Sequence, residues 1–259
     1  MRVETRLLPS AALGHDLEHR RYTSDAGMAG QTLLAFPSMN GRVWDWEDRG
    51  MVESIRHLID DGRLSLYVAD WIDWQSWAAE GKLPADRARR HDDYDRYLTD
   101  ELLPLVRDET ERETLWTSGC SMGAFHSASL FFRHPEAVDG LVAMSGVYQL
   151  RRFIGDYLDP SVLAASPIDR LSTEPDPAEL ALYRRARLAF CVGQGAWEDD
   201  MVADTRSMEA LCAARGIAGE FDYWGHDVNH DWPWWQKMLP YHLERLLEVS
   251  PLPKSPTAT

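Results

Sequence analysis

The sequence predicts an α/β fold with a mostly parallel central sheet and helices on both faces. Two observations support this prediction. Short apolar runs alternate with stretches of helical periodicity, and most runs are almost continuously apolar, as strands buried on both faces are. The chain of 259 residues is 44% apolar and 27% charged, which suits one large domain with a full core. We expect that domain to cover residues 1–249, followed by a flexible tail, 250–259.

The expected elements follow in chain order. Residues Arg2–Thr23 have the pattern of an antiparallel hairpin, interrupted near Leu13 and Gly14. The predicted buried strands are Thr32–Phe36, Leu64–Ala69, Thr114–Thr117, Gly140–Met144, Leu188–Val192 and Glu220–Trp224. The predicted helices are Met51–Asp61, Asp92–Arg107, Met122–Arg133, Thr205–Arg215 and Pro233–Leu247. Gly62 and Gly216 stand where helix C-caps belong.

Composition and charge exclude several classes of function. The formal net charge is −15, and the acidic residues form no tail. Nucleic acid and anionic membranes are therefore not expected as partners, because both require clustered Lys and Arg. No run approaches the roughly 20 apolar residues of a membrane span, and the N-terminus has no secretory signal, so cytoplasm is the expected location. The sequence is compatible with a homo-oligomer and does not determine the oligomeric state.

The cysteines indicate no metal or disulfide site. Cys120, Cys191 and Cys212 cannot all pair, and none of them has CxxC spacing. Neither a disulfide framework nor a zinc ribbon is therefore predicted. We expect no cofactor and no metal.

Residues Gly119–Gly123 (GCSMG) form a G-x-S-x-G pentapeptide between a predicted strand and a predicted helix. A nucleophilic serine requires such a sharp strand-to-helix turn, because its hydroxyl must stand clear of the sheet. The glycines permit strained backbone angles and close packing, and the helix that begins here directs N–H groups toward an oxyanion. The alternative, a glycine-rich turn with an incidental serine, is disfavoured by both flanks. The pattern predicts Ser121 as the nucleophile of an α/β-hydrolase fold.

The nucleophile needs a base, and the order Ser, acid, His along this fold limits the candidates. His126 and His134 belong to the helix after the serine and should point away from its hydroxyl. His242 falls inside the last predicted helix and is expected to be a surface or capping residue. His226 and His230 remain, both on the loop after the last strand. We prefer His230 because it immediately precedes the last helix.

The acid that orients the base should follow the strand Leu188–Val192. Three carboxylates stand there in a row, and we rank Glu198 first, with Asp199 or Asp200 as the alternatives. Two of the three can be solvated acids ahead of a helix, which is the usual place of such a run.

An acyl-transfer site also needs two donors for the oxyanion. One should be the backbone N–H of Met122, the residue after the nucleophile. The other should come from the loop after Thr32–Phe36, where Pro37 has no N–H. Ser38 and Met39 are the candidates, and we prefer Met39.

Most of the 11 tryptophans lie after the carboxyl ends of predicted strands, the edge at which open α/β sheets bind ligands. About half of these should pack loops against the body of the protein. The others would line a pocket for an apolar or aromatic acyl group or for a sugar ring. The candidates are Trp44, Trp71, Trp197 and Trp232.

With these residues in place, the chain resembles the putative-esterase (esterase D-like) family of α/β-hydrolases. That family includes feruloyl and acetyl xylan esterases, S-formylglutathione hydrolase and mycolyltransferases of the antigen 85 type. The resemblance runs from about Gln31 to Leu247 and rests on Gly119–Gly123, Tyr97–Pro104 and His230–Trp235. It favours His230 over His226, and Glu198 stands where the family has its acid.

The chain also departs from the family pattern at two places. Pro37-Ser38 replaces the usual His-Gly of the oxyanion loop, which leaves the second donor open. The insertion Gly146–Pro177 is short, so no large lid domain is expected.

The leading expectation is a carboxylic ester hydrolase that acts on a small-molecule ester through an acyl-enzyme intermediate. Acyl transfer to an alcohol or sugar hydroxyl would use the same residues. A non-catalytic binding protein with this fold is the alternative from another class. A peptidase has no specific support.

Overall fold

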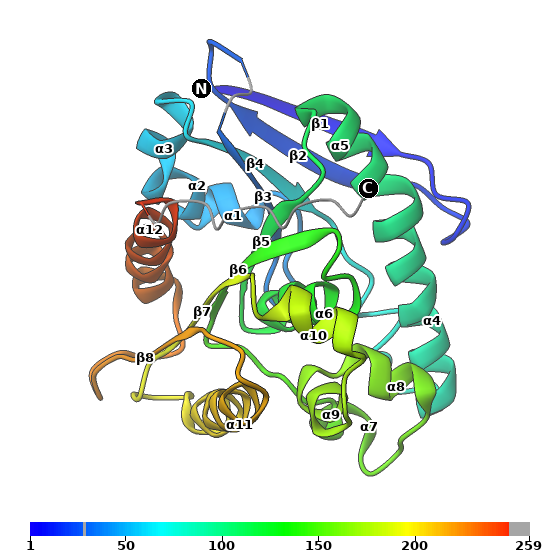
Figure 1. The fold of residues 1–259 in the computed structure, drawn as a ribbon. Coiled ribbons are helices and arrows are strands. Elements are labelled where there is room, and N and C mark those ends of the chain that lie inside the picture. Colours follow the sequence, from blue (N-terminus) through cyan, green and yellow to red (C-terminus); the bar gives the residue numbers. More distant parts are fainter. Residues whose placement is uncertain (28–29, 249–259) are drawn as a thin grey trace, which may run out of the picture.

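An eight-stranded sheet forms the centre of the fold in the computed structural model, which describes residues 1–27 and 30–248 (Figure 1). The strands are β1 (Arg2–Leu8), β2 (Leu17–Thr23), β3 (Gln31–Phe36), β4 (Leu64–Ala69), β5 (Leu115–Cys120), β6 (Val138–Met144), β7 (Arg187–Val192) and β8 (Glu220–Tyr223). Their order across the sheet is β1-β2-β4-β3-β5-β6-β7-β8. The predicted tail, 250–259, lies outside the described residues.

The pairing of the strands confirms the predicted fold class. β1 pairs with β2, and β2 with β4, in antiparallel register, while every pair from β4 to β8 is parallel. The hairpin predicted at the N-terminus is therefore present, with Gly14 in the left-handed region at φ 74°. Strands β4 and β5 are buried along their whole length, as their continuous apolar runs predict.

Helices cover both faces of the sheet (Figure 1). They are α1 (Asp45–Asp48), α2 (Met51–Ser54), α3 (Arg56–Asp60), α4 (Pro84–Arg96), α5 (Leu103–Thr110), α6 (Met122–Arg133), α7 (Arg151–Ile154), α8 (Pro160–Ala165), α9 (Pro167–Ser172), α10 (Pro177–Tyr183), α11 (Asp199–Arg215) and α12 (Trp232–Glu248). Helices α1–α3 and α12 share one core with the sheet, and α4–α6 and α11 share the other. The same figure shows the short helix α8 beside α4, with α9 next to α8.

Three predicted helices have clearly different boundaries in the structure. The helix predicted as Thr205–Arg215 begins at Asp199. The segment predicted as one helix, Met51–Asp61, is divided at Ile55, whose φ of −115° and ψ of 9° are not helical. The helix predicted from Asp92 instead begins at Pro84 and passes through a π-helical segment, Tyr97–Leu102. That wider turn directly precedes Pro104, which cannot donate a backbone hydrogen bond to the preceding turn. Local periodicity does not reveal either break.

The described helices also bear on the membrane prediction. None of them is long and apolar enough to cross a membrane.

Candidate active site

Ser121 occupies the turn between β5 and α6 by itself. β5 ends at Cys120 and α6 begins at Met122, so the serine has neither strand nor helix conformation. Its φ of 56° and ψ of −118° are strained for a residue with a side chain, and its N–H donates to the Met144 carbonyl at 2.9 Å. The neighbouring Cys120 is fully buried, and burial raises the pKa of its thiol, so this cysteine is unsuited to nucleophilic attack. The strand-to-helix turn that the pentapeptide predicts is present.

The two glycines of the pentapeptide allow this turn to pack closely. A Cβ on Gly119 would lie 2.2 Å from the carbonyl carbon of Gly123. A Cβ on Gly123 would lie 2.3 Å from the Phe36 carbonyl oxygen and 2.7 Å from that of Pro37. The start of α6 therefore rests directly on the end of β3 and on the loop that follows it.

His230 and Glu198 form a pair at the carboxyl edge of the sheet. His230 Nδ1 lies 3.2 Å from Glu198 Oε2. The Glu198 side chain is fully buried, while that of His230 is 17% exposed. The His230 ring also packs edge-on against Trp235, with the ring centroids 4.9 Å apart. The carboxylate therefore fixes one ring nitrogen and leaves Nε2 as the atom that can exchange a proton with a substrate.

Ser145, which sequence reasoning missed, holds the Glu198 carboxylate and is itself held by Trp235. Ser145 follows β6 and donates its hydroxyl to Glu198 Oε1 at 2.5 Å, and Trp235 Nε1 donates to Ser145 Oγ at 3.0 Å. The backbone of Ser145 is in the left-handed region at φ 48°, and its N–H donates to the Cys191 carbonyl. The only available signal was the position of Ser145 directly after a predicted strand, which many serines share.

The other candidates for the acid and the base lie elsewhere. Asp199 and Asp200 are exposed, and Asp200 pairs with Arg152. His226 is exposed, with its Nδ1 3.3 Å from the Gln194 carbonyl oxygen. Within the described residues no hydrogen bond joins Ser121 to His230. Of the predicted acids and bases, the structure thus brings together Glu198 and His230.

The three remaining histidines of the search have different surroundings. His126 in α6 is buried, and its Nε2 lies 2.9 and 3.0 Å from the two carboxylate oxygens of Asp73. His134 at the end of α6 contacts Asp95. His242 is 0% exposed, so the prediction of a surface or capping residue is wrong. It lies on the face of α12 that packs on the sheet, among apolar residues such as Leu239 and Leu243.

The predicted oxyanion donors lie on the two segments that meet at Gly123. Neither the Met122 nor the Met39 amide has a hydrogen-bond acceptor within the described residues. A turn closed by the Gly41 N–H and the Ser38 carbonyl at 2.9 Å shapes the Met39 loop. Trp71 Nε1 also donates to the Gly41 carbonyl at 2.6 Å, which anchors the far end of that loop.

The four tryptophans predicted for the pocket differ in exposure. Trp71 is 3% exposed and anchors the loop that contains Met39, whereas Trp197, beside Glu198, is 83% exposed. Trp44 is half-buried, with the Arg42 guanidinium 4.8 Å from its ring centroid. Trp232 is also half-buried and packs edge-on against Trp235.

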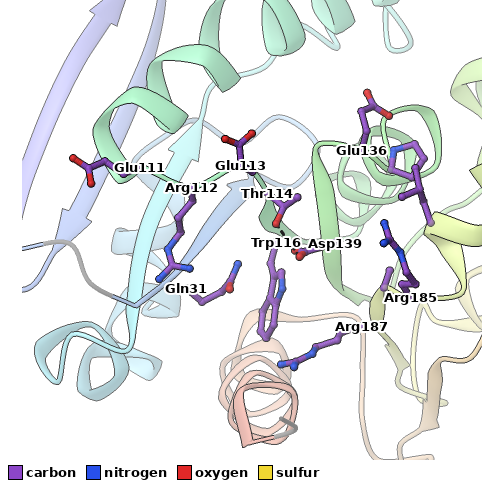
Figure 2. Close-up of a pocket in the computed structure, with 13 residues that line it drawn as sticks. Gln31, Glu111, Arg112, Glu113, Thr114, Trp116, Glu136, Asp139, Arg185 and Arg187 are labelled. Atoms are coloured by element: carbon purple, nitrogen blue, oxygen red, sulfur yellow. Dashed lines mark hydrogen bonds between the residues drawn. The ribbon is translucent and has the colours of Figure 1, made fainter. Parts of the chain in front are cut away.

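A separate cavity of about 580 Å³ opens at the opposite, amino-terminal edge of the sheet (Figure 2). Its walls include Trp116 and Arg187, whose guanidinium lies 5.7 Å from the Trp116 ring centroid. Neither Ser121 nor His230 lines this cavity. Open α/β sheets bind their ligands at the carboxyl ends of the strands. We therefore do not assign this cavity to the catalytic site.

Comparison with known proteins identifies the family. Residues 43–246 match the family described as Putative esterase, which covers most of the chain. The chain belongs to the putative esterase family. The resemblance predicted from the sequence is thereby confirmed, and an ester is the substrate class that the family implies. No curated protein sequence matches the chain.

Solved structures share the esterase's fold at low sequence identity. A ferulic acid esterase superimposes with a TM-score of 0.74 and 17% identity, covering 95% of this chain and 97% of that one. An S-formylglutathione hydrolase from Agrobacterium tumefaciens has a TM-score of 0.73 at 12% identity, with 95% and 94% covered. MPT51 from Mycobacterium tuberculosis has a TM-score of 0.68 at 16% identity, with 95% and 98% covered. These similarities establish the α/β-hydrolase fold.

Proposed function

We propose that this esterase is a serine carboxylic ester hydrolase that uses Ser121, His230 and Glu198 and forms an acyl-enzyme intermediate. One observation carries the proposal: a buried carboxylate contacts the histidine at the sheet edge where a serine stands in a strained strand-to-helix turn. Nucleophile, base and orienting acid are the three groups that acyl transfer to serine requires.

The first half of the reaction forms the acyl-enzyme. Ser121 Oγ attacks the carbonyl carbon of the ester while His230 Nε2 takes the hydroxyl proton. The negative charge that develops on the carbonyl oxygen accepts hydrogen bonds from the Met122 and Met39 amides. The C–O bond to the alcohol then breaks, and His230 gives its proton to the departing oxygen.

The second half releases the acid. Water loses a proton to His230 Nε2 and attacks the acyl carbon, and collapse of the intermediate returns the proton to Ser121. Glu198 stabilises the imidazolium in both halves, since its Oε2 faces Nδ1. Ser145 and Trp235 keep the carboxylate in place by the hydrogen bonds described above.

Ser121→Ala tests the nucleophile. We expect this variant to lose hydrolysis of short p-nitrophenyl esters and labelling by a fluorophosphonate probe, with an unchanged circular dichroism spectrum and Tm. The probe reacts with an activated serine whether or not a given ester is turned over. Turnover by the folded variant at the wild-type rate would refute the proposal.

The wild-type protein, assayed in parallel, distinguishes the alternatives. Labelling of Ser121 without cleavage of any ester in a panel of varied acyl length and alcohol would favour acyl transfer. Neither labelling nor cleavage would favour a binding protein. Cleavage with labelling is the outcome we expect.

A further inference from the structure

His242 is a buried histidine without a hydrogen-bond partner. It lies on the face of α12 that packs against the sheet, and it is 0% exposed. Both ring nitrogens are shielded from solvent, and neither makes a hydrogen bond within the described residues. An unsatisfied buried polar group costs free energy, so each such group calls for an explanation.

Two carboxylates of the edge strand β8 face this imidazole. Glu220 and Asp222 are two positions apart, so their side chains leave the strand on the same face. Glu220 Oε2 lies 3.7 Å from His242 Nδ1, and Asp222 Oδ2 lies 3.5 Å from Nε2. One ligand atom from each of the three residues can be chosen so that all lie within 4.8 Å of one another.

These separations are too long for hydrogen bonds, and each carboxylate faces a different ring nitrogen. An ion bound to one nitrogen therefore requires the carboxylate that faces the other nitrogen to turn toward it. Zinc binds nitrogen and carboxylate oxygen at about 2.0–2.2 Å in tetrahedral geometry, which places two ligand atoms roughly 3.3–3.6 Å apart. One imidazole nitrogen and two carboxylate oxygens, drawn together from within 4.8 Å of one another, would supply three of the four ligands of such a shell.

We propose that Glu220, Asp222 and His242 bind a divalent transition-metal ion, zinc by preference, with water at the remaining position. A mixed imidazole and carboxylate set suits zinc better than magnesium or calcium, which prefer oxygen alone. The two acids are 28% and 32% exposed, so water can reach the open position.

Neighbouring groups hold the two carboxylates in place. Arg245 contacts both oxygens of Glu220: its Nη2 lies 2.9 Å from Oε1, and its Nε donates to Oε2 at 3.4 Å. Trp224 Nε1 donates to Asp222 Oδ2 at 2.9 Å. Hydrogen bonds of this kind orient metal-binding carboxylates. The positive charge of Arg245 opposes a cation, so metal binding requires the negative charges of both Glu220 and Asp222 to outweigh it.

The ion would link β8, the edge strand of the sheet, to the C-terminal helix. A helix rises about 1.5 Å per residue, so His242 lies about 15 Å along α12 from Trp232, where the helix begins next to His230. The metal would therefore stabilise the fold rather than touch the ester. This proposal does not depend on the proposed hydrolytic mechanism.

Metal binding by the intact protein tests the proposal. Protein stripped with a chelator and dialysed is titrated with Co²⁺, whose visible absorption reports tetrahedral coordination, and with Zn²⁺ while Tm is recorded. We expect one equivalent to bind and Zn²⁺ to raise Tm by several degrees. Glu220→Gln and Asp222→Asn should each lose the Co²⁺ spectrum and the Tm increase, because the amides preserve shape but remove the charge.

The matched control is Glu209→Gln. Glu209 accepts a hydrogen bond from Tyr223 of the same strand and belongs to α11, on the opposite face of the sheet. This variant should bind Co²⁺ as the wild type does. Using amide variants avoids His242→Ala, which would leave a cavity in the core. Absence of a Co²⁺ spectrum in the wild type, or equal binding by Asp222→Asn, would overturn the assignment.

Discussion

Glu198 differs from the two acids that follow it in burial and in partner. Its carboxylate is enclosed and contacts both His230 and Ser145, whereas Asp199 and Asp200 are exposed. Burial of a charge is unfavourable unless hydrogen bonds compensate, and here two neighbours supply them. Burial of a carboxylate at this cost in free energy is typical of an acid that positions a catalytic base.

Glu198→Gln should therefore reduce turnover far more than Asp199→Asn. An amide in place of the carboxylate can hold His230 in the wrong tautomer and cannot stabilise the imidazolium, so kcat should fall by about 10³- to 10⁴-fold. Asp199→Asn should leave kcat nearly unchanged. Steady-state kinetics with a p-nitrophenyl ester measures both, and equal losses would remove Glu198 from the proposed mechanism.

The two loop histidines allow a similar comparison. His230→Ala should lower kcat by about 10³-fold or more, because no other histidine among the described residues contacts Glu198. His226→Ala should lower kcat by less than tenfold, since its ring is exposed and its Nδ1 faces the Gln194 carbonyl rather than a carboxylate. The ratio of the two kcat values is the measurement, and the reverse ranking would transfer the role of base to His226.

At the level of elements, α6 is held against two loops of the candidate site. Its first turn rests on the carbonyls of Phe36 and Pro37, and His126 ties its second turn to Asp73 in the loop after β4. The same β4 loop carries Trp71, which anchors the loop with the predicted oxyanion donor. The position of the nucleophile and that of the donor are thus coupled through packing.

Gly123→Ala tests this coupling. The new Cβ would meet two backbone carbonyl oxygens that cannot rotate away, so α6 or the loop must shift. We expect about 1–3 kcal/mol of destabilisation, which lowers Tm by several degrees, together with a fall in kcat as the oxyanion donors move. Gly81→Ala is the control, since a Cβ there meets nothing within 4 Å. Equal Tm values for both variants would contradict the close packing.

On the scale of the whole molecule, the sheet separates two cores that contain buried histidines. His91 in α4 packs against Trp77, with the ring centroids 4.8 Å apart, and its Nδ1 has no hydrogen-bond partner within the described residues. Burial holds the pKa of His91 well below its usual value of 6.5, and the nearby charges of His126 and Arg133 lower it further. Folding therefore keeps this imidazole neutral.

Stability should consequently fall as the pH drops below about 6.5. In that range the unfolded chain binds a proton at His91 and the folded protein does not, which costs about 1.4 kcal/mol per pH unit from this group; above it the group contributes no slope. We expect Tm to decline between pH 6.5 and 5, and to decline less in His91→Gln, which does not titrate. Parallel Tm profiles for the two proteins would rule out His91 as a source of this dependence.

Much of the fold follows from local sequence patterns. Neighbouring residues define the buried parallel strands and the helix α6. The positions of Ser121, Glu198 and His230 were predicted from the strand-to-helix turn before α6 and from the loops after β7 and β8. The π-helical segment before Pro104 and the break at Ile55 were missed, because apolar periodicity continues through both of them.

The sequence by itself determined the fold class, the strand-to-helix turn at Ser121 and a short set of candidates for its base and acid. All three depend on local patterns and on their order along the chain. Only the tertiary structure decided which acid contacts His230, that Ser145 holds this acid, and that His242 faces two carboxylates. Those contacts join segments tens of residues apart, and the packing of helices on the sheet, rather than local periodicity, brings them together.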